Sequence, residues 1–113
     1  MSKQLFRVGP FNNARWINER FITANRVEDV VKKIVEDMTR VVEKNLLAEQ
    51  KKLIKVDIYI ESVRPLYRKT FERNIVRYSK LIEDLAEVKT EDDLHIIPAF
   101  KHYRIEKLYP INA

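Results

Sequence analysis

The chain has 113 residues and carries 22 Lys and Arg against 17 Asp and Glu, so its formal net charge is +5. This length predicts a single domain over residues 1–113, with one core and no room for a separate catalytic domain. The absence of cysteine excludes disulfides, thiol nucleophiles and cysteine-ligated zinc. No apolar run approaches the length of a membrane span or resembles a signal region, so we expect a cytoplasmic protein with no membrane partner.

The amino-acid usage is unusual, with one glycine, no cysteine and 35% charged residues. Such usage restricts the unfolded chain and favours surface ion pairs, which is typical of proteins that work at high temperature. In composition the chain resembles small proteins of hyperthermophilic archaea or of their viruses. The resemblance covers the whole length but no motif, so it implies heat tolerance and assigns no functional residue.

The first elements in chain order are extended. Residues 4–8 form a short apolar run that Gly9-Pro10 ends, which predicts a first strand. Residues 11–24 begin with a turn signal at Asn12-Asn13 and then fit either a second strand or a short helix. We favour the strand, although apolar residues fall on both of its faces.

A long helix follows, from a cap at Asn25 to about Gln50. Glu28 is placed to complete a capping box with Asn25. An apolar stripe with helical spacing runs along this segment, and its members are Val27, Val31, Ile34, Met38 and Val41, broadened by Val30, Val35 and Val42. The stripe is wide enough to suggest a partner surface, and we expect a homodimer.

Residues 53–63 then alternate with a period of two, since Ile54, Val56, Ile58 and Ile60 are separated by polar residues or tyrosine. This pattern predicts a half-buried strand. Pro65 suits the first turn of a second helix over residues 65–88. Its apolar stripe comprises Tyr67, Phe71, Ile75, Tyr78, Ile82 and Leu85.

The C-terminal part is predicted as a loop at residues 89–93 and an extended region at residues 94–111. Pro98 divides that region into two strands, or into one edge strand with a bulge. The whole order predicts an α+β fold in which two long helices pack on one face of a small mixed sheet. This is an open-faced sandwich, ferredoxin-like in general layout.

Sequence motifs for catalysis are absent. One glycine excludes a glycine-rich phosphate loop, a dinucleotide fingerprint and glycine-dependent RNA-binding signatures. No serine, histidine and acid have the spacing of a nucleophilic triad, so we assign no catalytic residue and no cofactor. His95 and His102, with the acids of residues 91–93, could be read as a divalent-metal site, but ordinary surface residues explain them better. We therefore assign no metal ligand.

The strongest functional signal is the basic side of the second helix. Residues 64–80 contain six bases and one acid, Glu72, so this segment alone accounts for the net charge of the chain. The six bases are Arg64, Arg68, Lys69, Arg73, Arg77 and Lys80. Regular cations on a helix can contact successive phosphates of DNA or RNA, and we expect a non-catalytic nucleic-acid-binding protein.

Aromatic residues extend this hypothesis, because unpaired bases stack on exposed rings. The candidates for such stacking are Tyr59, Phe100, Tyr103 and Tyr109, if the open face of the predicted sheet lies alongside, and we assign Tyr59 and Tyr103 to the binding site. Trp16, beside Arg15, fits either a stacking platform or a core residue, and the burial tendency of tryptophan favours the core. Two other functions stay open: a self-assembling or protein-interaction domain, and a small metal-dependent nuclease that uses His95 and Asp93.

Overall fold

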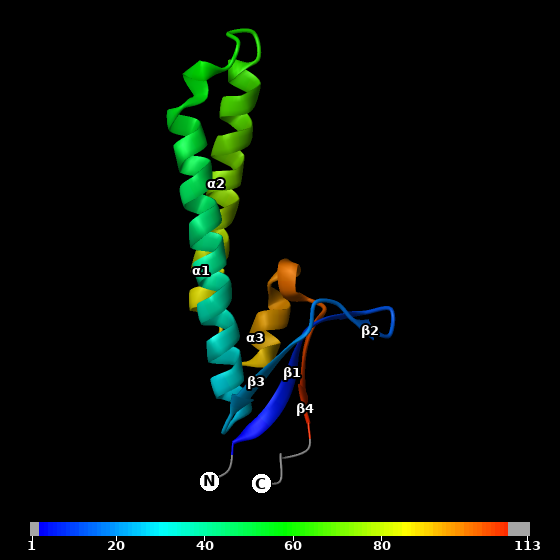
Figure 1. Cartoon of the computed structure of the whole chain (residues 1–113). Coiled ribbons are helices and arrows are strands. Elements are labelled where there is room, and N and C mark those ends of the chain that lie inside the picture. Colours follow the sequence, from blue (N-terminus) through cyan, green and yellow to red (C-terminus); the bar gives the residue numbers. More distant parts are fainter. Residues whose placement is uncertain (1–2, 109–113) are drawn as a thin grey trace. The chain divides into compact units, whose positions relative to one another are not determined.

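The computed structural model describes residues 3–108, and its contacts divide the chain into two compact units. Within the described residues, unit 1 contains residues 3–36 and 87–108, and unit 2 is Asp37–Ala86. The boundary lies inside helix α1 (Val27–Ile54), which begins in unit 1 and ends in unit 2 (Figure 1). The single domain expected from chain length stays a prediction.

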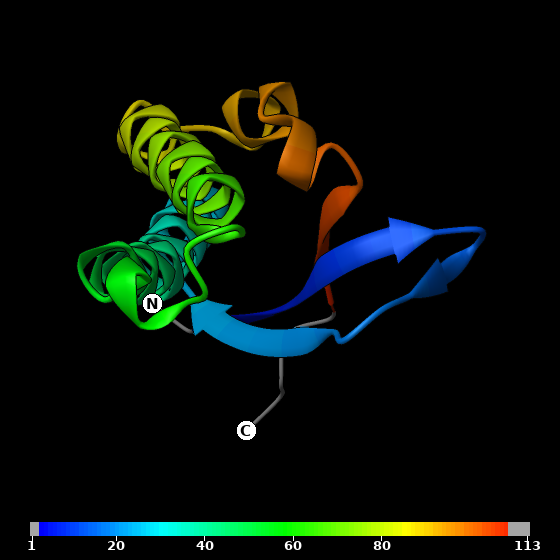
Figure 2. The same ribbon diagram turned by 90° about the horizontal axis from the view of Figure 1, so that it is seen from above.

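Unit 1 is built on a sheet of β1 (Gln4–Asn12), β2 (Arg15–Trp16), β3 (Arg20–Ala24) and β4 (Tyr103–Lys107). β1 pairs with the other three strands, and each pairing is antiparallel. The predicted mixed sheet is therefore wrong for the described residues. β3 and β4 pair with the same part of β1 from its two edges, so they run parallel to each other without pairing (Figure 2).

β1 is longer than the sequence predicted, because it continues through Gly9 and Pro10 instead of ending before them. At this point Gly9 and Pro10 of β1 lie opposite the three residues 17–19 that connect β2 to β3. The pairing therefore contains a bulge. Gly9 has φ 152°, and a Cβ added to it would lie 3.2 Å from the Glu19 Cα. The bulge thus needs glycine at this position.

The favoured interpretation of residues 11–24 is confirmed in part: the segment forms strand and not helix, but two strands, β2 and β3, replace the single strand expected. β1 and β2 are joined by a two-residue turn at Asn13 and Ala14, whose φ values are 54° and 60°. Positive φ at both positions is the conformation of a type I′ hairpin turn, which matches the twist of the two strands. The turn signal in the sequence was correct, although the turn lies one residue later than expected.

The core of unit 1 lies against one face of this sheet. Phe6 and Val8 of β1 have no exposed surface, and β1 alternation directs both to the same side. Other buried apolar residues of unit 1 come from β3, from the first turns of α1, from α3 and from the chain up to the start of β4: Ala24, Val30, Val31, Ile34, Leu94, Ile97, Phe100 and Tyr103. This burial explains why the valine-rich stretch forms a helix despite weak propensity.

The expected loop at residues 89–93 and the first of the expected C-terminal strands are wrong. Thr90 caps a short helix, α3 (Glu91–Ile96): its hydroxyl accepts from the Asp93 backbone N–H, and the Asp93 carboxylate accepts from the Thr90 N–H. This capping box satisfies backbone donors at the start of the helix. Residues 109–111 of the predicted extended region lie outside the described residues.

Unit 2 contains the rest of α1 and α2 (Arg64–Ala86), two long helices packed together. α2 confirms the predicted helix to within two residues at each end. Its apolar stripe is the covered side, since Phe71 and Leu85 are buried. The buried Glu49 of α1 lies 3.2 Å from the Lys52 ammonium and accepts a hydrogen bond from the Asn74 amide of α2 at 3.4 Å.

The predicted strand at residues 53–63 is wrong. α1 continues to Ile54, and a single 3₁₀ turn, η1 (Val56–Ile58), leads into the connection to α2. Without this strand, the ferredoxin-like layout and a sheet that carries both long helices on one face are not shown. The established class is α+β, with two packed helices and an open antiparallel sheet. None of the helices in residues 3–108 combines the length and apolar character needed to cross a bilayer.

Candidate nucleic-acid interface

The basic side of α2 is exposed along its length. Lys69, Arg73, Arg77 and Lys80 follow one another by four, four and three positions, so they form one stripe of the helix. The stripe lies opposite the covered side that contains Phe71 and Leu85, and all four basic residues are exposed. From first to last it spans about 16 Å at the rise of an α-helix. We call these four residues the basic stripe.

Two of the six predicted cations lie off this stripe and have partners. The Arg64 Nε donates to the Tyr59 backbone carbonyl at 2.8 Å, and the residue is half-buried. Arg64 therefore fixes the connection before α2. Arg68 lies 3.9 Å from the Asp57 carboxylate, with both side chains largely exposed. An exposed pair at this distance leaves the Arg68 charge mostly available to a ligand.

The basic stripe has no ion-pair partner within residues 3–108. Arg77 does lie over the ring of its neighbour Tyr78, with the Arg77 Cζ 5.6 Å from the ring centre. No carboxylate of the described chain pairs with these four cations. Their charges are therefore available to a polyanion.

The two predicted stacking tyrosines have different surroundings. Tyr59 lies in the connection before α2 and stacks on Tyr67 with ring centres 4.3 Å apart and planes 17° apart. One face of the Tyr59 ring is therefore already covered. Tyr103 lies in unit 1, is 8% exposed and packs edge-on against Phe100. Its ring belongs to the core, so we leave Tyr103 out of the candidate interface.

A second group of aromatic and basic residues, which the sequence did not suggest as a group, lies on the sheet of unit 1. Strand register places Phe11 opposite Trp16, Arg7 opposite Phe21, and Gly9 opposite Arg104. Because residues paired across a sheet share a face, and alternate residues of β1 do too, these side chains lie on one face. We call Arg7, Phe11, Trp16, Phe21 and Arg104 the aromatic-arginine face.

Each arginine of this face lies over two rings. The Arg7 Cζ is 5.3 Å from the Trp16 ring centre and 5.8 Å from that of Phe21. The Arg104 Cζ is 4.6 Å from the Phe11 ring centre and 5.9 Å from that of Trp16. Phe11 and Trp16 also meet edge to face, with centres 5.3 Å apart. Rings and guanidinium groups therefore alternate, at distances typical of cation–π interactions.

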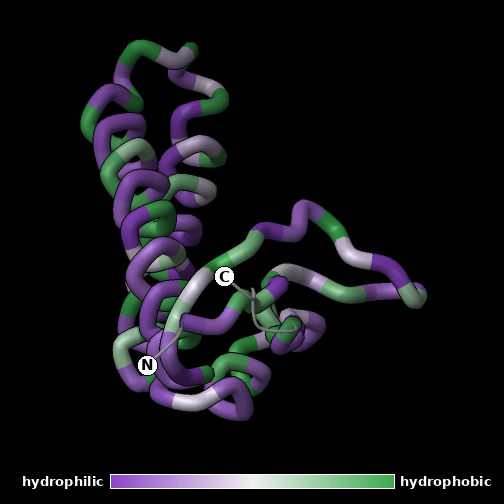
Figure 3. Tube along the Cα trace, turned by 60° about the horizontal axis from the view of Figure 1, so that its bottom comes forward, coloured by the Kyte–Doolittle hydropathy of each residue, from purple (hydrophilic) through white to green (hydrophobic). Residues whose placement is uncertain are grey.

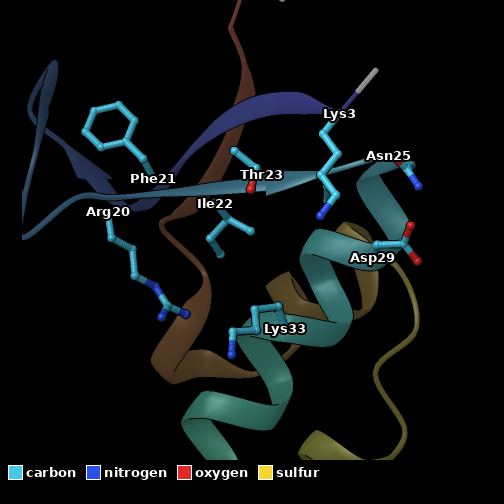
Figure 4. A pocket seen from close by; sticks show the side chains of 9 residues that line it. Lys3, Arg20, Phe21, Ile22, Thr23, Asn25, Asp29 and Lys33 are labelled. Carbon is cyan, nitrogen blue, oxygen red and sulfur yellow. The ribbon is translucent and has the colours of Figure 1, made fainter. Parts of the chain in front are cut away.

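Phe21, one residue of this face, also lies beside a pocket near β3. Figure 4 shows Phe21 on the opposite side of the strand from Arg20 and Ile22, which point toward α1. The pocket on the α1 side is lined by Lys3, Arg20, Phe21, Ile22, Thr23, Ala24, Asn25, Asp29 and Lys33. Arg20 and Lys33 already interact with other groups of the chain. These two cations are therefore not free to bind an anionic ligand in this pocket.

Two residues of the possible metal site, Glu91 and His95, bond to the backbone of β4. The Glu91 carboxylate accepts from the Ile105 backbone N–H at 3.3 Å, and the His95 ring bonds to the Tyr103 carbonyl. His95 and Glu91 lie 3.9 Å apart. In residues 3–108, no group of three or more histidines and carboxylates is arranged to hold a metal ion.

The pKa of the Asp93 carboxyl is lowered by the start of α3. Backbone N–H groups of Lys89 and then of Thr90 donate to its carboxylate, at 3.0 and 3.1 Å, and they hold the pKa of Asp93 below its ordinary value. The cause is the capping of α3, so the shift indicates a structural role and not an acid or base for catalysis.

Comparisons with protein-family models, with curated proteins and with solved structures gave no match.

Proposed function

We propose that this protein binds nucleic acid without catalysis, and that the basic stripe of α2 contacts the phosphates. The observation that carries the proposal is the exposure of Lys69, Arg73, Arg77 and Lys80 in one row with no carboxylate partner in the described chain. Each phosphate that is neutralised releases condensed counterions, which is the main source of sequence-independent affinity. Arg68, with its weak partner Asp57, extends the surface.

The helix gives the stripe its function because it holds the four cations at fixed spacing. Cations along about 16 Å of helix can contact successive phosphates of one strand without reading bases. The arginine forks can bind phosphate oxygens in pairs, whereas the lysines act as point charges. We therefore expect binding to DNA and RNA of any sequence, with affinity that falls as salt rises.

Charge reversal at the centre of the stripe tests the proposal. In fluorescence anisotropy with labelled single-stranded and duplex DNA and RNA at low salt, wild type should bind each ligand. The Arg73→Glu, Arg77→Glu variant should lose roughly 100-fold or more in affinity, because two attractions become repulsions. Both side chains are exposed, so circular dichroism should show an unchanged fold.

A matched control separates the stripe from net charge. Lys32→Glu, Lys44→Glu changes the net charge equally but alters exposed cations of α1. This control should keep most of the wild-type affinity. Equal losses in both double variants, or no binding by wild type at low salt, would reject the basic stripe as the binding surface.

Self-association is a second candidate function, and one observation favours it. The connection between α1 and α2, with the helix ends on either side of it, exposes four large aliphatic residues: Ile54 at 80%, Ile58 at 77%, Ile60 at 76% and Leu66 at 67%. Hydrophobic segments alternate with hydrophilic ones in this region (Figure 3). Exposed apolar residues gathered in one place are typical of a protein contact.

The occupant of this patch would be a second copy of the chain. Lys55, Asp57, Glu61 and Arg68 surround it with both signs of charge, so two copies can pair opposite charges in a symmetric contact. Light scattering should find a dimer for wild type and a monomer for Ile58→Asp, Ile60→Asp. Val76→Asp, an exposed apolar position of α2 ten residues beyond Leu66, is the control and should leave the dimer intact. A wild-type monomer at all concentrations would remove this candidate.

A further inference from the structure

We infer that the aromatic-arginine face of unit 1 binds unpaired bases, and that the nucleic acid recognised by this protein includes single-stranded segments. The inference takes its ligand class from the proposed function but depends on other residues in the other unit. It adds base stacking, which the basic stripe cannot provide.

The face is arranged as a stacking surface and not as a core. Its three rings come from β1, β2 and β3, which are held in register by backbone pairing. Phe21 is 53% exposed, and Trp16 and Phe11 are half-buried, although large aromatic residues are normally well covered. In the same sheet, Phe6 points to the other side and has no exposed surface. The exposed rings thus occupy the face that the core of unit 1 does not use.

The arginines indicate the chemistry of the ligand. A guanidinium over a ring occupies the position that a base would take, and it can turn toward a phosphate when the base arrives. Arg104 is exposed and has no carboxylate partner in residues 3–108, so it is the cation best placed for this exchange. A neutral apolar partner would gain nothing from the cations.

Charge on the face favours stacking over phosphate binding. The Arg7 Nε lies 3.1 Å from the Glu19 carboxylate, in an ion pair without hydrogen-bond geometry, and Glu106 is opposite Arg7 across the sheet. These two acids equal the two arginines in number, so the face has no net charge. Affinity at this surface must therefore come mainly from ring contacts, each worth a similar free energy for any base.

Ring contact also selects the strand state. In a duplex the faces of the bases are covered by their neighbours, so rings fixed on a sheet cannot reach them. In a single strand the bases can separate and lie on Phe21 and Trp16. The basic stripe, by contrast, contacts phosphates, which both forms expose.

Trp16 is the single tryptophan of the chain, so its fluorescence reports on this face alone. We expect single-stranded oligothymidylate to quench Trp16 emission, with the same midpoint as its binding by anisotropy. Duplex DNA should bind without comparable quenching. Absence of quenching at oligothymidylate concentrations that saturate the anisotropy signal would overturn the inference.

Phe21→Ala gives the affinity test and leaves the fluorophore in place. Loss of one stacked base should weaken binding to the single strand by roughly 5- to 150-fold, with duplex affinity unchanged. Ile96→Ala is the matched control, because Ile96 is 78% exposed in the same unit but lies on α3. The control should bind as wild type does. Equal affinity of Phe21→Ala and wild type for the single strand would reject the face as a stacking surface.

The two proposals fail in different ways. If Arg73→Glu, Arg77→Glu binds like wild type while oligothymidylate still quenches Trp16, the phosphate proposal for α2 fails and the aromatic-arginine face stands. If that double variant loses binding and wild type never shows quenching, the function stands and the inference about the face is overturned.

Discussion

The two arginine-bearing surfaces of this protein use the same cation in opposite ways. On α2, the arginines and lysines of the basic stripe extend from a helix into solvent without acidic partners in the described chain. On the sheet of unit 1, the Cζ atoms of Arg7 and Arg104 lie over aromatic rings, 4.6 to 5.9 Å from the ring centres. A cation that extends into solvent can contact a phosphate. A cation over a ring occupies a position that a planar base could take. A count of arginines alone would not have separated the two surfaces.

The largest expected effect separates the two faces of the sheet. Phe6→Ala removes a ring with no exposed surface and should lower the free energy of unfolding by about 3–5 kcal/mol. Phe21→Ala, on the aromatic-arginine face, should change it by no more than about 1 kcal/mol because the ring is half in water. Urea titration followed by circular dichroism measures both. A large loss in Phe21→Ala would make this face structural.

The second effect separates phosphate contacts from ring contacts. Four cations on duplex DNA predict a slope of roughly −3.6 in the plot of log affinity against log salt, so a fourfold rise in salt should weaken binding roughly 150-fold. Lys80→Gln should reduce the steepness by about 0.9. Phe21→Ala should leave the slope for duplex DNA unchanged. A change of slope in Phe21→Ala would mean that the two surfaces act as one.

The third effect is a loss of stability at low pH in unit 1, where Glu91 and His95 of α3 bond to the backbone of β4. The folded state lowers the pKa of Asp93, so its contribution to stability is complete above the ordinary pKa of 3.8. That contribution is lost as pH falls through the lowered folded-state pKa. Asp93→Asn should therefore flatten the loss of stability at low pH, measured as melting temperature against pH. An unchanged acid profile would contradict the assigned hydrogen bonds.

The smallest effect tests the hairpin that carries Trp16. Ala14 has φ 60°, in the left-handed region where a Cβ is unfavourable. Ala14→Gly should relieve this strain and raise the free energy of unfolding by about 0.5 kcal/mol, after the greater freedom of the unfolded chain is subtracted. A thermal melt measures the gain. Binding of oligothymidylate should stay the same, because the substitution leaves the face intact.

Sequence periodicity predicted the two long helices and the opposite faces of α2, because each apolar stripe continues over several turns. It failed at residues 53–63, where a spacing of two was read as a strand. Alternation identifies a strand only where one set of side chains is buried, and here Ile54, Ile58 and Ile60 are exposed. With no partner strand for the segment, local helix formation prevailed.

Short-range signals explain the other differences. Thr90 and Asp93 form a capping box, and recognising it would have predicted α3 in place of a loop. Gly9-Pro10 was read as the end of a strand, although the pair forms part of a bulge that a strand can contain. That error hid the alternation of Arg7, Gly9 and Phe11 on one face. Grouping of those residues with Phe21 and Arg104 depends on strand register, which no local pattern provides.

The path of the chain through the two units also bears on how such a protein can diversify. The chain leaves unit 1 after Glu36 and returns at Glu87, and every described strand pairing is formed by residues outside that interval. Connecting a longer segment between fixed ends costs only about 0.6 kcal/mol per doubling of length. Descendants of this chain could therefore gain or lose whole helical turns in the inserted hairpin without altering any strand. The basic stripe would then contain different numbers of cations in different descendants, while the sheet stayed the same.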